Sequence, residues 1–265
     1  MDIDSAVAVV TGAGSGIGRA LAQALAAGGA SVVAGDLDAD AAAQTAAGLG
    51  ARAVGIGADA ASAGGIAAML DTARSRFGPV DIYVANAGVI GASGLGSEGD
   101  WDRVLEVNLR GHIRAADALL PDWTARGRGH FVSVASAAGL LTQVGAAGYA
   151  VSKHAAVGFA EWLAITYGDN GIGVTCVCPM GVDTPLLGDI RDSADPVARV
   201  AADSITTAGE VLSAQRVADL TVEAVRADRF MVLPHPGVGE MFRGKATDHD
   251  RWIAGMRRYQ RTLQG

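Results

Sequence analysis

Cysteine is nearly absent from this chain, which has only Cys176 and Cys178 among its 265 residues. The two lie two positions apart in a strand-like run, so their side chains point to the same face but are too far apart for an unstrained disulfide. With no third cysteine, the sequence argues against a thiolate zinc site. Reduced thiols are typical of cytoplasmic proteins, and a cytoplasmic location is expected.

An excess of basic residues is also missing. The formal net charge is −7 at pH 7 and the sequence pI is about 5.1, whereas a nucleic-acid-binding surface needs a basic stripe to neutralise phosphates. The sequence therefore predicts no nucleic-acid partner. One arginine-rich stretch lies near the C-terminus with acidic residues beside it, which favours a solvated helix face; its arginines are Arg251, Arg257, Arg258 and Arg261.

Long hydrophobic runs are lacking as well. No stretch of about 18 apolar residues occurs without a glycine or a charge, which argues against a membrane span, and the acidic start at residues 1–4 shows no signal-peptide pattern. The five histidines show no metal-ligand spacing, so no metal site is predicted. Among them, His154 should point away from its neighbour Lys153, and the position of His235 between two prolines favours a surface loop over a pocket mouth.

Short apolar runs that alternate with alanine-rich helical stretches make up most of the chain. Half of the residues are hydrophobic, and the runs are rich in β-branched residues and almost continuously apolar, as in strands buried on both faces. This alternation predicts an α/β fold with a doubly wound parallel sheet and helices on both faces. No repeat or linker divides the chain, so one domain over residues 1–265 is expected. The clearest strands are expected at residues 7–10, 31–34, 53–56, 82–85, 130–134 and 174–177.

Two regions interrupt the alternation. Residues 185–210 form a polar, mixed segment after the sixth expected strand, and we expect this segment to supply much of a substrate pocket wall. Residues 234–265 form a tail with large apolar residues at every third or fourth position, which is a helical stripe. The stripe predicts packing on the domain or on another subunit, with a cap over a pocket as the alternative. Its members are Trp252, Met256, Tyr259 and Leu263.

A glycine-rich turn follows the first expected strand directly. Residues 11–18 read TGAGSGIG, and a helical run begins immediately after them. Glycines allow backbone N–H groups to approach a diphosphate, and the helix N-terminus adds partial positive charge. The spacing is T-G-x-x-x-G-x-G rather than strict G-x-G-x-x-G, which leaves a plain tight turn as the alternative. The glycines of the pattern are Gly12, Gly16 and Gly18.

Asp36 stands at the end of the second expected strand, shortly after the glycine-rich turn. A carboxylate at this place accepts hydrogen bonds from the hydroxyls of an adenosine ribose and repels a 2′-phosphate. Ser15 and Leu37 are uncharged, so neither supplies the cation that such a phosphate needs. These residues therefore favour NAD over NADP, with a solvated loop acid as the alternative for Asp36.

Tyr149 and Lys153 lie four residues apart on a helix expected over residues 148–167, and they therefore share one face. The pairing is informative because the chain has only two lysines and four tyrosines. The ordinary pKa of a tyrosine is about 10, and a nearby ammonium group lowers it towards the value that proton transfer near neutrality requires. The spacing indicates a general acid–base pair, with an aromatic ring stacked over a lysine stem as the alternative.

Taken together, these features resemble the short-chain dehydrogenase/reductase family of single-domain type, over nearly the whole chain. Residues 11–18 resemble the glycine loop of that family, residues 86–88 (NAG) its N-A-G motif, and residues 149–153 (YAVSK) its Y-x-x-x-K motif. Ser136 stands 13 residues before Tyr149, at the place of the family's catalytic serine. Asn108 stands at its fourth catalytic position, and Asp59 matches the acid that binds the adenine amino group.

The resemblance implies a Rossmann-type fold of about seven strands and a division of labour among four catalytic residues. Ser136 would hydrogen-bond the substrate oxygen, and Tyr149 would exchange a proton with it. Lys153 would lower the pKa of the tyrosine and hold the nicotinamide ribose, while Asn108 would hold a water that links Lys153 to solvent. The NAD contacts that it implies come from Gly12, Ser15, Gly16, Ile17, Gly18, Asp36, Leu37, Asp59, Ala60, Asn86, Gly88, Tyr149, Lys153, Val182 and Thr184.

Alternatives stay open for several of these residues, and one position departs from the family. Ser133 is a rival to Ser136 but falls inside an expected strand, Asn108 could bend a buried helix, and Asp59 could cap the next helix. Met180 stands where the family usually has glycine, close to the expected nicotinamide position. An apolar substrate wall is expected from Leu140, Leu141, Gln143, Met180, Leu186, Leu187, Ile190 and Val197.

The sequence therefore predicts an NAD-dependent oxidoreductase that interconverts a partly apolar secondary alcohol and a ketone by hydride transfer. An epimerase or dehydratase on the same fold is one alternative, although such relatives are usually longer. A non-catalytic dinucleotide-binding protein is another, but it would be expected to lose Ser136, Tyr149 or Lys153. Members of the family are commonly homotetramers or homodimers, so a homo-oligomer is expected, through the helices that contain Asn108 and Tyr149.

Overall fold

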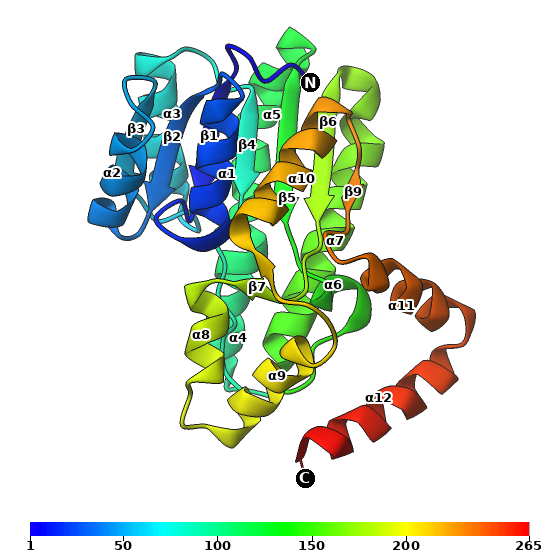
Figure 1. The fold of residues 1–265 in the computed structure, drawn as a ribbon. Helices are drawn as coiled ribbons and strands as arrows, with labels where there is room; N and C mark the ends of the chain where they lie inside the picture. The colour runs from blue at the N-terminus through cyan, green and yellow to red at the C-terminus, as the bar shows by residue number, and fades with distance from the viewer. Residues whose placement is uncertain (265) are drawn as a thin grey trace.

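A seven-stranded sheet forms the centre of the computed structural model, which describes residues 1–264 (Figure 1). The strand order is β3-β2-β1-β4-β5-β6-β9, and every pairing in it is parallel. The predicted doubly wound parallel sheet is thereby confirmed. Its strands are β1 (Val7–Thr11), β2 (Ser31–Asp36), β3 (Ala53–Gly57), β4 (Ile82–Ala85), β5 (Gly129–Val134), β6 (Ile172–Val177) and β9 (Met231–Val232).

The central strands are buried on both faces because alternate side chains enter two different cores. In β1, Val7 and Val9 belong to one cluster of buried side chains, whereas Ala8 and Val10 belong to the other. This arrangement explains why the strands read as continuous apolar runs rather than as alternating ones.

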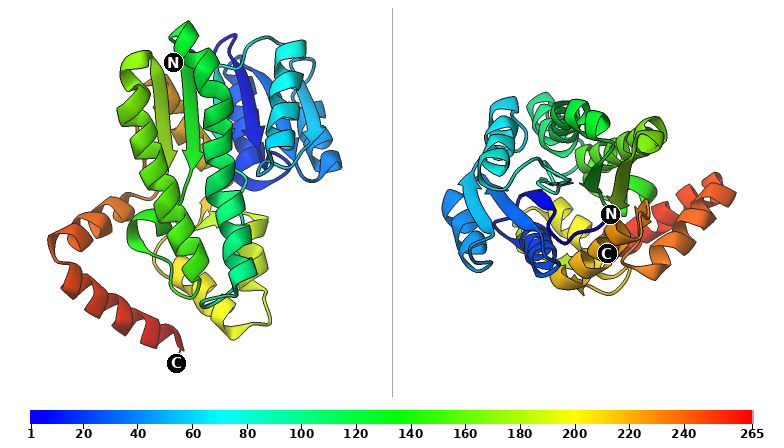
Figure 2. Two further views of the ribbon diagram at one scale, coloured as in Figure 1. Left: turned by 180° about the vertical axis from the view of Figure 1, so that it is seen from behind. Right: turned by 90° about the horizontal axis from the view of Figure 1, so that it is seen from above.

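Helices cover the two faces as the alternation of the sequence predicts. The apolar sides of α1 (Gly16–Ala27) and α10 (Ala214–Arg226) close one core. Those of α3 (Ala63–Arg76), α5 (Gly111–Arg126) and α7 (Ala147–Tyr167) close the other, which faces the viewer in the left view of Figure 2. The short helix α2 (Ala39–Ala47) packs beside β2 and β3 at the sheet edge.

Further elements lie beyond the carboxyl ends of the strands, at the lower side of Figure 1. They include α4 (Glu98–Leu105), the π-helix η1 (Glu106–Arg110), α6 (Ala138–Leu141) and the paired short strands β7 (Val182–Asp183) and β8 (Leu212–Ser213). The expected polar segment 185–210 forms α8 (Pro185–Arg191) and α9 (Pro196–Thr206), each with a proline in its first turn. The 3-10 turn η2 (Gly168–Asn170) precedes β6.

The expected tail leaves the sheet after β9 and forms two helices, α11 (Pro236–Thr247) and α12 (His249–Gln264). Figure 1 shows α11 running outward and α12 returning beneath the body towards α9, and α12 contacts α9. The arginines of α12 are exposed, which confirms the predicted solvated face. Gly265, the last residue of the expected tail and domain, lies outside the described residues.

The strand order predicts where a binding crevice lies in this sheet. The chain builds β2 and β3 on one side of β1 and then crosses to β4 on the other side. Loops at the carboxyl ends of β1 and β4 therefore depart in opposite directions, and ligands of such sheets bind in the opening between them. The glycine loop follows β1, and the NAG segment follows β4.

His130 makes the stability of this fold depend on pH. The side chain is buried in β5, and its Nε2–H donates to Thr175 Oγ1 (2.9 Å), since the Thr175 hydroxyl donates its own proton to Arg229 O (2.9 Å). Burial lowers the pKa of His130 to about 4. The neutral imidazole is therefore the form that the folded chain keeps.

We expect the free energy of unfolding to fall as the pH drops from about 6.5 towards about 4. In this pH window the unfolded chain binds a proton at residue 130 that the folded chain does not bind. The resulting loss in the free energy of unfolding approaches about 3 kcal/mol. Urea unfolding across these pH values measures it. His130→Gln keeps a donor for Thr175 without titrating, so it should show a shallower pH dependence; an unchanged dependence would contradict the assignment.

Candidate active site

A cavity of about 930 Å³ opens at the carboxyl ends of the strands and collects most of the sequence-predicted site residues. Its volume is within the range of small-molecule and cofactor sites. Gly18 and Asn108 are the predicted residues that do not line it. Those that do are Gly12, Ser15, Gly16, Ile17, Asp36, Leu37, Asp59, Ala60, Asn86, Gly88, Ser136, Tyr149, Lys153, Val182 and Thr184.

The glycine loop presents free backbone N–H groups to this cavity. Gly12 and Gly16 have φ values of +62° and +49°, in the left-handed region that favours glycine. Ser15 precedes α1 without a side-chain cap, so the first turn of this helix keeps unpaired N–H groups for an anion. A Cβ on Gly18 would lie 2.0 Å from Gly12 O, so Gly18 is required for the packing of the loop on its own helix.

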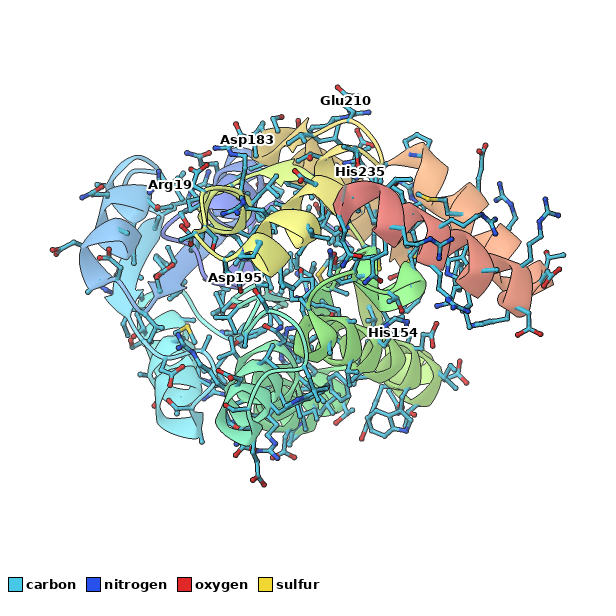
Figure 3. The ribbon with its side chains drawn as sticks, turned by 90° about the horizontal axis from the view of Figure 1, so that it is seen from below. Arg19, His154, Asp183, Asp195, Glu210 and His235 are labelled. Atoms are coloured by element: carbon cyan, nitrogen blue, oxygen red, sulfur yellow. The ribbon has the colours of Figure 1, made fainter. Side chains whose placement is uncertain are left out.

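Asp36 lies at the end of β2 beside this loop, as predicted. Its Oδ2 accepts a hydrogen bond from Gly14 N (2.8 Å), and its Oδ1 accepts one from Asp38 N (3.0 Å). The neighbouring Leu37 side chain is 78% exposed. Arg19, labelled in Figure 3, was not predicted from the sequence. Its guanidinium donates to the carbonyl oxygen of Gly14, the same residue whose N–H bonds Asp36.

Asn86 and Asp59 are both occupied by backbone groups next to the cavity. Asn86 Nδ2 donates to Thr11 O (2.8 Å), and Asn86 N donates to Thr11 Oγ1 (2.9 Å), so the NAG segment is tied to the end of β1. Asp59 Oδ1 accepts from Ala61 N (2.9 Å) at the turn that precedes α3. Both residues line the cavity in addition to these local contacts.

Ser136, Tyr149 and Lys153 meet at one wall of the cavity. Ser136 Oγ accepts from Ala138 N (3.1 Å) in the turn after β5. Lys153 Nζ lies 5.7 Å from the centroid of the Tyr149 ring and donates to Val134 O (3.0 Å). The α7 helix holds the tyrosine and the lysine on one face, as their spacing predicts. The rival Ser133 points away into the core, where it pairs with His112 Nδ1 (3.2 Å).

Burial dominates the ionisation of this pair. It raises the pKa of the Tyr149 phenol above the ordinary value, and the interaction with the Ser136 hydroxyl opposes that rise. Burial also lowers the pKa of the Lys153 ammonium to about 8. In the free protein the net pKa of Tyr149 therefore lies above its ordinary value, because desolvation penalises the phenolate more than the neighbouring hydroxyl stabilises it. The expected lowering of this pKa by Lys153 stays a prediction.

Asn108 lies in the π-helix between α4 and α5 and is fully buried. Its Nδ2 donates to Val89 O (2.8 Å) and Ser152 Oγ (3.0 Å), and its Oδ1 accepts from Val89 N (2.9 Å). It does not bond Lys153, but both residues approach Gly88: a Cβ there would lie 3.3 Å from Asn108 Oδ1 and 3.5 Å from Lys153 Nζ. A side chain at residue 88 would thus occupy the space between them.

The expectation that His235 lies in a surface loop is wrong. Its side chain is buried beneath the loop that follows β6, where Figure 3 labels it. Met180 N donates to His235 Nδ1 (3.2 Å), and His235 Nε2–H donates to Gly181 O (3.0 Å). The imidazole thus holds the backbone of the segment in which Met180 replaces the usual glycine. The pattern P-H-P gave no signal of this burial, because the burial depends on contacts with the distant loop after β6.

The remaining cavity wall is mostly apolar, although charged residues such as Arg103, Glu106 and Asp189 also line it. Two predicted wall residues, Leu140 and Val197, do not belong to it. Leu140 instead lines a separate hollow together with His154, and Val197 is 41% exposed. Residues of α9 and the tail that the sequence reasoning did not single out for the substrate wall, such as Ile205 and Met241, also line the cavity. The predicted wall residues that do so are Leu141, Gln143, Met180, Leu186, Leu187 and Ile190.

Comparison with known proteins identifies the family to which this chain belongs. Residues 6–195 match the family model described as short chain dehydrogenase. The chain belongs to this family. The short-chain dehydrogenase is 35% identical over 233 residues to cis-4-hydroxycyclohexanecarboxylate dehydrogenase of Sinomonas cyclohexanicum, covering 83% of this chain and 94% of that relative.

Two further relatives agree. Cyclohexanol dehydrogenase of an Acinetobacter species is 34% identical over 194 residues, which cover 71% of this chain and 77% of that protein. The crystal structure of a short chain dehydrogenase/reductase from Burkholderia phymatum in complex with NAD superposes with a TM-score of 0.84 at 32% identity, covering 94% of this chain and 96% of the other. The likeness thus extends over nearly the whole fold.

Within residues 1–264, no group of three or more His, Cys, Asp or Glu is placed to hold a metal ion. No helix in that range is long and apolar enough to cross a bilayer. Cys176 and Cys178 are free and buried, with their sulfur atoms 3.9 Å apart.

Thr142 stores backbone strain between Ser136 and Tyr149. It ends α6 with φ +85° and ψ 161°, a conformation that is essentially confined to glycine and costs of order 1–3 kcal/mol for other residues. The residue lines the cavity. In the chain, the turn that contains Ser136 precedes this residue and α7 follows it.

We expect Thr142→Gly to raise the free energy of unfolding by about 1 kcal/mol, because relief of the strain exceeds the extra flexibility of glycine in the unfolded chain. Urea unfolding measures the change. Thr72→Gly is the matched control: Thr72 lies within α3 at a half-buried site, and its replacement should destabilise the fold by about 0.5–1 kcal/mol. A loss of stability in Thr142→Gly would contradict the strain.

Proposed function

We propose that this short-chain dehydrogenase interconverts a secondary alcohol and a ketone with NAD as the hydride acceptor. The observation that carries the proposal is the meeting of Ser136, Tyr149 and Lys153 on one wall of a cavity that also contains the glycine loop and Asp36. A proton-transfer group, a donor for the substrate oxygen and a dinucleotide cradle are the three parts that this reaction needs.

The residues present fit NAD. The unpaired N–H groups at the start of α1 suit its diphosphate, and Asp36 suits the hydroxyls of its adenosine ribose while repelling a 2′-phosphate. Asp59 and Ala60 would hold the adenine end. A Cβ on Gly16 would lie 3.0 Å from Thr184 Cγ2, so Thr184 faces the glycine loop across the cradle. The other proposed contacts are Ser15, Ile17, Leu37, Asn86, Gly88 and Val182.

Three side chains would move the proton. The Ser136 hydroxyl orients the substrate oxygen, and the Tyr149 phenolate accepts the alcohol proton in the oxidation direction. Lys153, as an ammonium 5.7 Å from the ring centroid, favours that phenolate. When bound, NAD supplies a hydride acceptor at C4 of its nicotinamide and a positive charge that opposes the raised pKa of the tyrosine. Asn108, on the far side of Gly88, would hold a water that links Lys153 to solvent.

An apolar, ring-bearing alcohol is the substrate class that we propose. The cavity wall beyond Tyr149 includes many leucine, isoleucine and methionine side chains, beside a few charged ones such as Arg103 and Asp189. Two relatives are named for cyclohexane alcohols. An epimerase, dehydratase or purely binding role is not favoured, because all three proton-handling residues are present and meet in one place.

We also propose one domain and a homo-oligomer, in the cytoplasm. The α7 helix leaves apolar side chains exposed, and such a face is typical of subunit contacts. These side chains are Val151 (49% exposed), Trp162 (51%) and Ile165 (84%).

Replacement of the tyrosine tests the proton transfer. Tyr149→Phe should lower the turnover of cyclohexanol with NAD by about 10²- to 10⁴-fold, the usual contribution of general acid–base catalysis. NADH absorbance follows the reaction, and a calorimetric titration should show NAD bound as in the wild type. Tyr167→Phe, on the same helix outside the cavity, is the control and should keep full activity. Undiminished turnover in Tyr149→Phe would reject its role.

Cofactor choice is tested at the end of β2. Asp36→Ala combined with Leu37→Arg should shift the ratio of kcat/KM values towards NADP by about tenfold or more, because a repelling charge is exchanged for an attracting one. Leu37→Arg alone separates the two effects, and it also reveals any damage from the lost bond between Asp36 and Gly14 N. A double variant that still excluded NADP would disprove the placing of Asp36 at the ribose.

A further inference from the structure

The C-terminal helix α12 forms part of the same cavity as the catalytic residues. Trp252, Met256 and Tyr259 of this helix line it, together with Met241 of α11. None of the residues of α12 is fully buried, and the half-buried ones lie along the apolar stripe. Trp252 also packs against the core cluster that contains α7. The helix therefore touches the body of the molecule along one face only.

A hydroxyl group anchors this helix to α9. Tyr259 Oη donates to Ser204 O (3.0 Å) and lies 2.7 Å from the Thr207 hydroxyl. Ser204 Oγ in turn accepts from Gln143 Nε2 (2.9 Å), in the segment between Ser136 and Tyr149. A short chain of hydrogen bonds thus connects α12, through α9, to the segment that carries the catalytic serine and tyrosine.

The face of α12 that meets the cavity carries no charge. Its cavity-lining residues are aromatic rings and a thioether, whereas its arginines are exposed on the solvent side. The helix contacts α9, and Figure 1 shows it beneath the body of the molecule. A wall of this composition stabilises an uncharged apolar group and offers nothing to a small polar one.

We propose that α12 is a specificity-determining wall of the substrate pocket. Trp252 and Met256 contact the part of the alcohol that lies away from the reacting carbon, and Tyr259 acts as a positioning residue that holds the wall against α9. The alcohol that the wall selects carries a bulky, uncharged apolar ring system. This inference rests on the proposed function, since it concerns the substrate of the same site.

Two alcohols of different size test the wall in the full-length enzyme. Trp252→Ala should raise KM for a bicyclic alcohol, decahydro-2-naphthol, by about tenfold or more, the range known for lost apolar contacts in specificity pockets. KM and kcat for 2-propanol should stay unchanged, because this small alcohol does not reach the wall. Met256→Ala should act in the same direction. Tyr259→Phe, which loses only the hydroxyl, should raise KM for the bicyclic alcohol by a smaller factor.

The matched control is Ile253→Ala, which removes an apolar side chain from the neighbouring position of α12. Ile253 is 49% exposed and does not line the cavity, so its replacement should change neither KM. Circular dichroism checks that each variant keeps its helix content. An equal loss for both alcohols, or a loss in Ile253→Ala, would show a general structural effect and overturn the inference. Unchanged constants in Trp252→Ala and Met256→Ala would overturn it as well.

A binding measurement separates this inference from the proposed reaction. Calorimetric titration of decahydro-2-naphthol into NAD-loaded Tyr149→Phe enzyme reports contact with the wall without turnover. If decahydro-2-naphthol binds in this background and Trp252→Ala weakens its binding about tenfold, the wall is supported. This holds even if the wild-type enzyme oxidises neither alcohol; in that case only the proposed reaction fails. No binding of the bicyclic alcohol would overturn the wall.

Discussion

The tie between the ends of β1 and β4 is the constraint on which the site depends. Thr11 Oγ1 donates to Val84 O and accepts from Asn86 N, while the Asn86 side chain donates to Thr11 O. These bonds satisfy buried polar groups at the point where the sheet order reverses, and they therefore hold the crevice at a defined width. The glycine loop and the NAG segment can then face the same cavity.

Burial also sets the ionisation of Tyr149 and Lys153, the pair that we propose for proton transfer. Tyr149 and Lys153 both lose solvent, which raises the pKa of one and lowers the pKa of the other to about 8. Each shift favours the neutral form, so the free site resists the separation of charge that catalysis requires. A positive group that enters the cavity changes this balance most strongly, because a charge acts over a longer range in a water-poor site. The chemistry is thereby coupled to occupation of the cradle.

The gathering of the glycine loop, Asp36 and the Tyr149–Lys153 pair at one cavity could be predicted from the sequence, because local rules specify each of these features. The T-G-x-x-x-G-x-G spacing, the acid at the end of β2 and the Y-x-x-x-K helix face each depend on residues close together in the chain. His235 and Thr142 could not be predicted in this way. The burial of His235 depends on contacts with the loop after β6, and the conformation of Thr142 is imposed by the elements on both sides of it. Patterns in sequence do not encode such distant partners.

The part of the cavity proposed for the substrate is built differently from the part proposed for the cofactor. Backbone groups at strand ends form much of the cradle, so its shape is fixed by the sheet and survives changes of side chain. Side chains of α8, α9 and α12, which lie outside the sheet, form much of the other wall. One hydrogen bond, from the Tyr259 hydroxyl to the Ser204 carbonyl, holds α12 against α9, so few substitutions suffice to move this wall. A family that keeps one reaction while changing its alcohols is the outcome that this division of the fold favours.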